Sequence, residues 1–344
     1  MMDRRLAVYS GSHFVVDFAC FVVLIGAFAA HATAAVVAGG FLVYNFIAFA
    51  LQMPLGYAAD VLRLRPSTLA VPGTLLVAVG VLMQSLPWVA LAVCALGNAL
   101  FHLGGGIDSL VNAKGGFARP GVFISFGALG VVTGTWVGAH RALPLAVVVL
   151  LLVACAGLQL LVRQALPYRH QANFRLAPAP IARADVAIFL LMLVVLVRSL
   201  GGLLVDTPWK TGGLAFVAAA CVFAGKFVGG MLADRFGART VVIVSLAVSA
   251  PLVTILPANV VAGCIGLFCF NVMTAVTLVA IAARLPGHPG FAFGLTTLAL
   301  FIGATIPMLL LIPPPTRPLI LWGLIAVALV CGVLCTTNRK EAVE

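Results

Sequence analysis

The sequence predicts an all-α membrane protein of twelve transmembrane helices, built as two six-helix pseudo-repeats. The chain of 344 residues is 63% hydrophobic and only 8% charged, with a mean hydropathy of +1.20. A water-soluble domain has too little polar surface to cover so much apolar content. Apolar runs of about 20 residues, each long enough to cross a bilayer, recur along the whole chain. A short pattern of glycine, aspartate and arginine also occurs twice, with Asp60 and Asp234 placed 174 positions apart (234 − 60).

The twelve apolar runs are expected to be helices. Backbone groups inside a lipid bilayer find no water to bond, so a spanning segment must satisfy them within itself. In chain order the predicted spans are 6–28, 34–58, 67–85, 88–110, 117–139, 143–163, 185–205, 212–233, 240–256, 259–282, 289–311 and 317–336.

Basic residues are distributed unequally between the two sides of the predicted membrane. With the N-terminus inside, the inner loops and tails carry fifteen of the twenty Lys and Arg residues, and the outer loops carry only Arg141, Lys210 and Arg317. This positive-inside bias predicts a multi-pass protein of the inner (cell) membrane with both termini in the cytoplasm. The formal net charge of +11 therefore reports orientation, and we expect no nucleic-acid partner.

The sequence gives no sign of an enzyme, a cofactor or a metal site. The eight cysteines fall within or beside apolar runs, as small packing residues do. Neither HExxH nor GxSxG occurs, and there is no GxxxxGK[ST] loop to hold ATP for a primary pump. We therefore expect no catalytic residues, no cofactor and no metal ligands.

The two halves of the chain repeat each other. Asn98 and Asn271 lie 173 positions apart (271 − 98), close to the spacing of the two aspartates. At the same offset of 173 (294 − 121), three positions of the fifth span match three of the eleventh: Gly121, Gly130 and Gly134 correspond to Gly294, Gly303 and Pro307. We expect an N-terminal half at 1–163, a cytoplasmic linker at 164–184 and a C-terminal half at 185–344. Because six spans return the chain to the same side, the repeat is parallel.

A carboxylate follows the second span of each half at its cytoplasmic end. Both spans run inward, so Asp60 and Asp234 lie near helix C-termini, where a negative charge opposes the helix dipole. They would be better placed against the N-terminus of a helix from the other half, or against nearby arginines. We predict a latch between the halves; a loop whose charges only set topology is the alternative. The latch residues are Asp60, Arg63, Gly230, Asp234, Arg235, Gly237 and Arg239.

The second copy of this pattern resembles a known family signature. GMLADRFGAR at 230–239 looks like the signature of the major facilitator superfamily in the loop between helices 8 and 9. GYAADVLRLR at 56–65 is similar to its counterpart between helices 2 and 3, without the second glycine. Twelve spans and a central inner linker extend the resemblance over the whole chain. It implies alternating-access transport, with the substrate held between the two halves.

The fifth span carries a second resemblance. Its glycines are similar to the helix-5 motif of drug-efflux antiporters, with Thr135 at the position of the family's proline. This implies export, although small residues four apart also let helices pack closely. SHFVVDF, ALFHLGG and VRSL loosely resemble the fosmidomycin-resistance branch of efflux proteins. The motif glycines are Gly121, Gly130, Gly134 and Gly138.

Polar residues deep within the predicted spans are candidates for the transport site, since ionisable groups in a membrane are costly and rare. Asp17 and His13 share one face of the first span, and we expect a proton relay there. Arg198 lies in the seventh span and indicates an anionic or zwitterionic substrate; a structural ion pair with Asp17 is the alternative. The full set of candidates is Asp17, His13, His102, Arg198, Lys226, Asn98 and Asn271.

These observations predict a secondary active transporter that exports a small molecule by proton coupling. A proton-coupled symporter that imports a small organic anion is the alternative, and a non-transporting membrane receptor or scaffold is a remote one. The expected partners are a small-molecule substrate, protons and the lipid bilayer. We expect a monomer.

Overall fold

The computed structural model describes residues 3–164, 179–205, 207–310 and 312–338, and these residues are helical apart from short connections. No β-strand occurs among them, so the prediction of an all-α fold is confirmed. Most of the predicted linker, residues 165–178, lies outside the described residues.

The helices before the linker follow the apolar runs of the sequence. Asp3 and Thr33 accept backbone N–H bonds at the starts of two of them, as N-cap residues do. Two helices pass through π-helical turns, η1 Val22–Phe28 and η3 Phe46–Ala50. The α-helices are α1 Arg4–Phe21, α2 Ala34–Asn45, α3 Gln52–Val61, α4 Pro66–Leu82, α5 Pro87–Val111, α6 Ala118–Ser125, α7 Gly127–His140 and α8 Leu145–Leu161.

The helices after the linker are similar in length and composition. Asn259 caps one of them through its side chain, and Gly237 joins two others with a φ of +87° that favours glycine. These helices are α9 Ala184–Leu204, α10 Gly213–Phe236, α11 Ala238–Thr254, α12 Val260–Val272, α13 Thr274–Ala282, α14 Pro289–Leu309 and α15 Arg317–Cys335.

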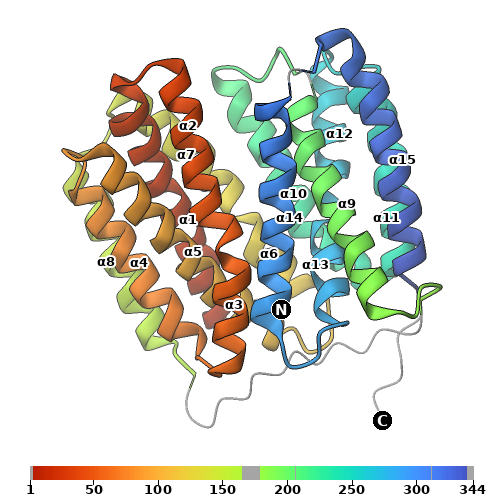
Figure 1. The fold of residues 1–344 in the computed structure, drawn as a ribbon, viewed down its shortest axis with the longest axis horizontal. Coiled ribbons are helices and arrows are strands. Elements are labelled where there is room, and N and C mark those ends of the chain that lie inside the picture. The colour runs from red at the N-terminus through yellow and green to blue at the C-terminus, as the bar shows by residue number, and fades with distance from the viewer. Residues whose placement is uncertain (1–2, 165–178, 206, 311, 339–344) are drawn as a thin grey trace.

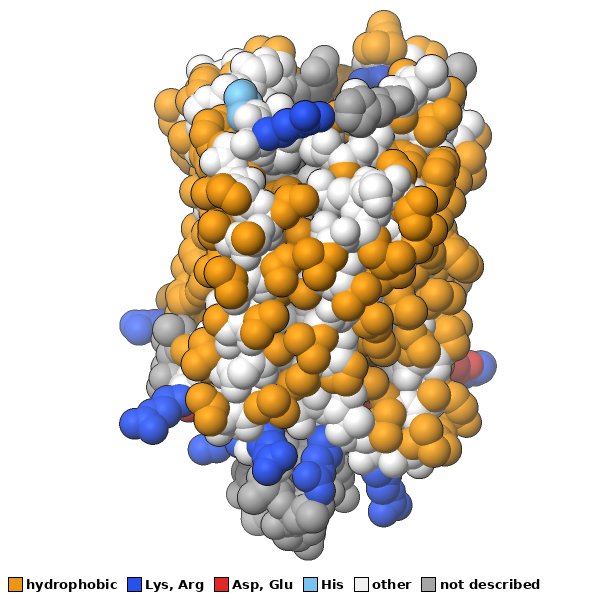
Figure 2. Space-filling model, turned by 90° about the vertical axis from the view of Figure 1, so that its left-hand side faces the viewer, with side chains coloured by type: hydrophobic (Ala, Val, Ile, Leu, Met, Phe, Trp, Pro, Cys, Tyr) orange, Lys and Arg blue, Asp and Glu red, His pale blue; other side chains and the backbone are white. Residues whose placement is uncertain are grey.

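The surface of the bundle is suited to a membrane. Among the described residues, nine helical stretches are long and apolar enough to cross one. Three further apolar helices, α4, α8 and α11, have 17 residues each and correspond to the predicted spans 67–85, 143–163 and 240–256. Figure 2 shows a broad band of hydrophobic side chains around the waist of one face, with Lys and Arg side chains gathered toward its two ends.

Two pairs of helices join the parts of the chain that lie on either side of the linker. In Figure 1, α1 to α5 and α8 stand on one side of the bundle and α9 to α15 on the other. Between them, α3 packs against α14, and α6 packs against α10. Both crossings lie toward the end of the bundle where α3 ends and α14 begins, which we call the latch end.

Glycines allow these helices to approach closely. A side chain at Gly56 would collide with the backbone of Gly290 on α14, and one at Gly230 would collide with the backbone of Phe117. The glycines of the fifth predicted span have similar packing roles: Gly130, Gly134 and Gly138 face the backbone of the first span, and Gly121 faces the backbone of α10 at Lys226. All four glycines therefore lie at close helix contacts.

Candidate functional site

A cavity of about 560 Å³ lies between the helices that precede the linker and those that follow it. Its volume is within the range of small-molecule binding sites. Most of its wall is apolar, with polar side chains contributed by both parts of the chain: His13, Asp17, Asn45, His102, Thr135, Arg198, Ser199, Lys210, Lys226, Thr274, Thr277, Thr296 and Thr297.

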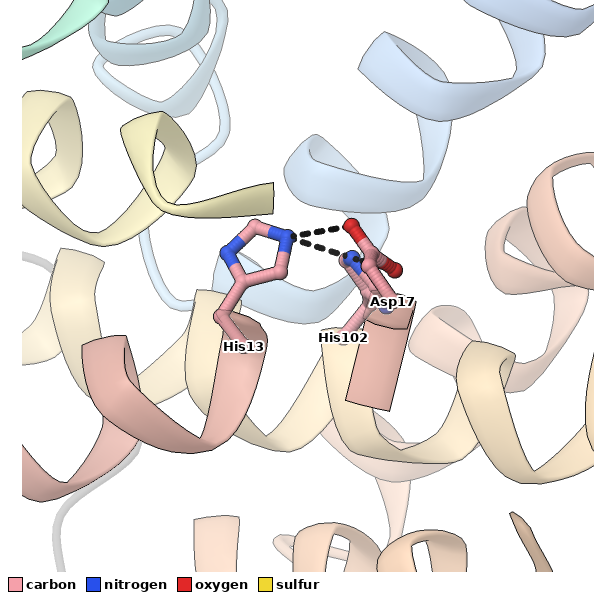
Figure 3. A group of neighbouring side chains, drawn as sticks. All are labelled: His13, Asp17 and His102. Carbon is pink, nitrogen blue, oxygen red and sulfur yellow. Dashed lines mark hydrogen bonds and ion pairs between the residues drawn. The ribbon is translucent and has the colours of Figure 1, made fainter. Parts of the chain in front are cut away.

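On one wall, helical spacing brings two side chains of α1 together, and a third comes from α5. His13 and Asp17 are four residues apart, so they share a face, and the His13 Nε2 atom lies 3.2 Å from an Asp17 carboxylate oxygen. The Nε2 atom of His102 lies 3.6 Å from the other carboxylate oxygen. The two Nε2 atoms are 2.8 Å apart. Figure 3 shows the three side chains converging on one point.

The remaining polar atoms of this group are held by the surrounding helices. The Nδ1 atom of His13 is 2.7 Å from the backbone carbonyl of Phe123 on α6, and the Nδ1 atom of His102 is 2.9 Å from the carbonyl of Asn98. The Asn98 amide donates a 2.8 Å hydrogen bond to Asp17. All four residues are at most 9% exposed, so the group is fixed by its contacts as well as buried.

The same three residues offer ligand atoms that could hold a metal ion. One nitrogen of each histidine and one oxygen of Asp17 all lie within 4.8 Å of one another. Two nitrogen ligands at ~2.05 Å from a tetrahedral zinc ion would be about 3.3 Å apart. The observed 2.8 Å between the Nε2 atoms is shorter, so the rings would have to separate before a metal ion fitted.

The opposite wall of the cavity carries positive charge. Arg198 on α9 and Lys226 on α10 both line it. The Nε atom of Arg198 is buried and has no hydrogen-bond partner among the described residues. Among the described residues, Asp17 forms ion pairs with His13 and His102 and none with Arg198. The structure therefore does not contain the Asp17–Arg198 ion pair that was the alternative.

Two predicted site residues, Asn98 and Asn271, do not line the cavity. Asn271 is buried at 6% exposure, donates to the carbonyl of Leu267 one turn earlier and packs beside Gly225. It does not belong to the cavity lining. Its partner in the repeat, Asn98, reaches the site only through Asp17. Asn98 and Asn271 therefore occupy matching positions in the repeat but have different contacts.

Gly127 belongs to the site, although the sequence analysis did not select it. A side chain at this position would collide with the Asp17 carboxylate and the His13 ring. Its backbone lies at the start of α7, directly after the break that separates α6 from α7 at Phe126. The signal that could have found it is modest: it is one more glycine in the span that already contains the motif glycines.

At the latch end, Asp60 reaches across to α14. Its carboxylate accepts hydrogen bonds from the backbone N–H groups of Gly290 at 2.9 Å and Phe291 at 2.7 Å. These are N–H groups of the first helical turn, which have no partner within the helix and carry the positive end of its dipole. Asp60 itself is only 5% exposed.

Asp234 makes the equivalent contact with α6. Its carboxylate accepts from the backbone N–H of Phe117 at 3.0 and 3.2 Å, and from that of Ala118 at 2.9 Å. The aspartates differ by 174 positions and their partners by 173 (290 − 117), so both contacts follow the offset seen in the sequence. Each aspartate lies at a helix N-terminus on the other side of the linker.

The other latch residues have more local contacts. Arg239 donates two hydrogen bonds to the backbone carbonyl of Thr336, just after α15, and thus stays within the C-terminal part. Arg235 is exposed and lies 5.5 Å from the ring centroid of Phe236. Arg63 is exposed, with a left-handed φ of 51°.

A second charge cluster lies beside Asp234 at the latch end. Arg119 binds both Asp3 and Asp108, and Arg5 lies 3.7 Å from Asp108. Burial alone would raise the pKa of Asp3, but hydrogen bonds from Arg119 and from the N–H of Leu6 outweigh it, so the pKa lies below its usual value. This cluster ties the start of α1 to α5 and α6.

Solved structures share this fold over nearly the whole chain, whereas neither family models nor curated protein sequences gave a match. A crystal structure of the E. coli fucose:proton symporter FucP aligns with a TM-score of 0.70 over 96% of this chain and 98% of that one, at 15% identity. A bacterial homologue of the iron transporter ferroportin, in an outward-facing state, aligns with a TM-score of 0.64 over 97% and 98% of the two chains, at 14% identity. FucP is a major facilitator superfamily transporter. The chain therefore has the fold of the major facilitator superfamily.

Proposed function

We propose that the protein is a secondary active transporter that works by alternating access. The observation that carries this proposal is the cavity, which is lined by charged side chains from both sides of the linker, above two carboxylate contacts that hold those sides together. Twelve membrane-spanning helices form two six-helix halves, at 1–163 and 185–344, and the linker at 164–184 joins them. Breaking the contacts of Asp60 and Asp234 lets the halves rock around the cavity.

The substrate that we propose is a small anionic or zwitterionic molecule. Arg198 supports this, because its buried Nε atom lacks a partner among the described residues. A buried cationic donor without a partner is costly, and a carboxylate or phosphonate would supply two parallel acceptors for the guanidinium group. Lys226 lines the same cavity and would add a second positive charge.

Transport is coupled to protons through the group of His13, Asp17 and His102. The direction that we propose is export, on the resemblance of the fifth span to the helix-5 motif of efflux antiporters. Import by symport is the second candidate, and the likeness to the fucose:proton symporter favours it. The protein acts as a monomer in the inner (cell) membrane, with both termini in the cytoplasm and no nucleic-acid partner.

The test has two stages. Purified full-length protein is first screened by thermal shift against small carboxylates, phosphonates and zwitterions, because a ligand that binds the folded state raises the melting temperature. The ligand found is then followed in membrane vesicles of known orientation under an imposed pH gradient. Accumulation in inside-out vesicles with an acidic lumen supports export, and accumulation in right-side-out vesicles with an acidic exterior supports import. The absence of any gradient-dependent flux of a confirmed ligand would contradict coupled transport.

A further inference from the structure

The hydrogen bonds of His13 and His102 fix where their protons lie. In each ring the Nδ1 atom contacts a backbone carbonyl, at 2.7 Å for His13 and 2.9 Å for His102. A carbonyl oxygen can only accept, so each Nδ1 must carry a hydrogen. In a neutral imidazole the other nitrogen then has a bare lone pair. Two neutral rings would therefore direct their Nε2 lone pairs at each other.

The Nε2 atoms are too close for that state. They are 2.8 Å apart, and each also faces an oxygen of the Asp17 carboxylate. Lone pairs and a negative charge would then meet in a buried space without a donor between them, which is the costly case for buried polar groups. One added proton on either Nε2 turns this contact into a charged hydrogen bond.

We propose that His13 and His102 share a single proton between their Nε2 atoms, with Asp17 as its fixed counter-ion. The inference builds on the proposed function, because it assigns the coupling proton to one position. Asp17 then balances the charge and does not itself carry the proton. On this assignment the site holds one proton.

The charges around the pair limit it to that one proton. Asp17 is the acidic side chain in the cavity lining, whereas Arg198, Lys210 and Lys226 line the same space and are basic. Behind Asp17, the Asn98 amide lies 3.7 Å from the thiol of Cys20. A second proton would abolish the bond between the rings and add another positive charge to a cavity that already has an excess of them. The same excess disfavours a divalent metal ion at this position.

Gly127 makes this arrangement possible as a positioning residue. The start of α7 passes so close to the pair that any side chain there would meet His13 and Asp17. Meanwhile the carbonyl that holds the His13 ring comes from Phe123, on the other side of the break in this span. The path of one span therefore sets both the orientation and the clearance of the His13 ring.

The test measures proton positions directly, by ¹⁵N NMR of the full chain with labelled histidine in lipid nanodiscs at neutral pH. The chain has six histidines, and His13→Gln and His102→Gln assign the two signals. We expect one ring of the pair to be doubly protonated and the other to carry its hydrogen on Nδ1 only, or an average of the two states. Either substitution should abolish the doubly protonated signal. Two neutral rings, one of them with its hydrogen on Nε2, would overturn the inference.

A substitution that leaves both histidines in place gives a second test. Gly127→Ala should remove the shared-proton signal, and Gly157→Ala on α8, which has open space around it, should leave it intact. An unchanged signal in Gly127→Ala would refute the positioning role. Titration with Zn²⁺ decides between proton and metal: stoichiometric replacement of the proton signal by metal-shifted ring signals would assign a metal site instead. If the shared-proton signal is present but the protein transports no solute, the proposed function is wrong and this inference stands. If the protein transports a solute but the signal is absent, this inference is wrong and the proposed function stands.

Discussion

The contact between Asp234 and α6 gives the sharpest mechanical prediction. Asp234→Asn keeps the size of the side chain and one acceptor oxygen but removes the charge that faces the N–H groups of Phe117 and Ala118. Hydrogen bonds to a charged group contribute about 1.5–3 kcal/mol, and a neutral one about 1 kcal/mol. The loss for one such bond is therefore about 0.5–2 kcal/mol, which corresponds to a shift of about 2- to 30-fold toward states in which the latch end is open.

The assay is hydrogen–deuterium exchange of the full-length protein in nanodiscs, read at both contacts. Exchange at Phe117 and Ala118 should rise in Asp234→Asn because the acceptor itself is weakened. The informative amides are those of Gly290 and Phe291, which bind the untouched Asp60. If the two contacts open together, exchange there should rise about 2- to 30-fold as well.

The control is Asp185→Asn. Asp185 is an exposed carboxylate that pairs with Arg183 in its own segment, away from the latch contacts, so exchange at both latch contacts should stay unchanged. If Asp234→Asn affects only Phe117 and Ala118, the carboxylate is a local helix cap, and the reasoning about a latch is refuted.

Three further substitutions test the cavity and the helix crossings. Arg198→Lys keeps the charge and loses the planar fork, so we expect about tenfold weaker binding of an anionic ligand by calorimetry with an unchanged melting temperature; equal affinity would refute the anion contact. Asp17→Asn removes the counter-ion of the histidine pair, so gradient-driven accumulation in vesicles should be lost while ligand binding remains; undiminished accumulation would exclude a role in coupling. Gly56→Ala places a methyl group against the backbone of Gly290, so the melting temperature should fall and hydrogen exchange at the latch end should rise. Gly157→Ala, which has open space around it, should change neither. A normal melting temperature in Gly56→Ala would show that the α3–α14 crossing tolerates a wider spacing.

Much of the fold could be predicted from the sequence because its strongest signals are local or repeated. Apolar runs are a property of each segment, and they coincide with the helices of the structure. The positions of Asp60 and Asp234 also followed from local reasoning, since a carboxylate at a helix C-terminus is unfavourable unless another helix presents its N-terminus. The repeat then pointed to the same solution on both sides of the linker.

The details of the candidate site depended on distances that a single sequence does not contain. Gly127 matters because of the path that α7 takes past His13, and nothing in its immediate neighbours signals this proximity. The contact between the His13 and His102 rings joins residues 89 positions apart, so neither spacing nor composition predicts which of their nitrogens face each other. The repeat predicted the level of Asn271 along its helix but not the direction of its side chain. That side chain donates to the carbonyl of Leu267 and does not line the cavity.

Asp60 and Asp234 both accept hydrogen bonds from backbone N–H groups. These hydrogen bonds therefore do not require particular side chains on the donor residues. Any residue other than proline supplies an N–H group, so positions 117, 118 and 291 can change identity without losing the donor, whereas a side chain at Gly290 would collide with the backbone of Gly56. Only the aspartates and the glycines that permit the approach are constrained. A contact of this kind can survive extensive sequence change, which is consistent with a shared architecture at 15% identity to a transporter of known structure. The contact between the two sides of the bundle thus depends on a handful of positions, and under the proposed mechanism the rest of the chain would be free to adapt to a substrate and a membrane.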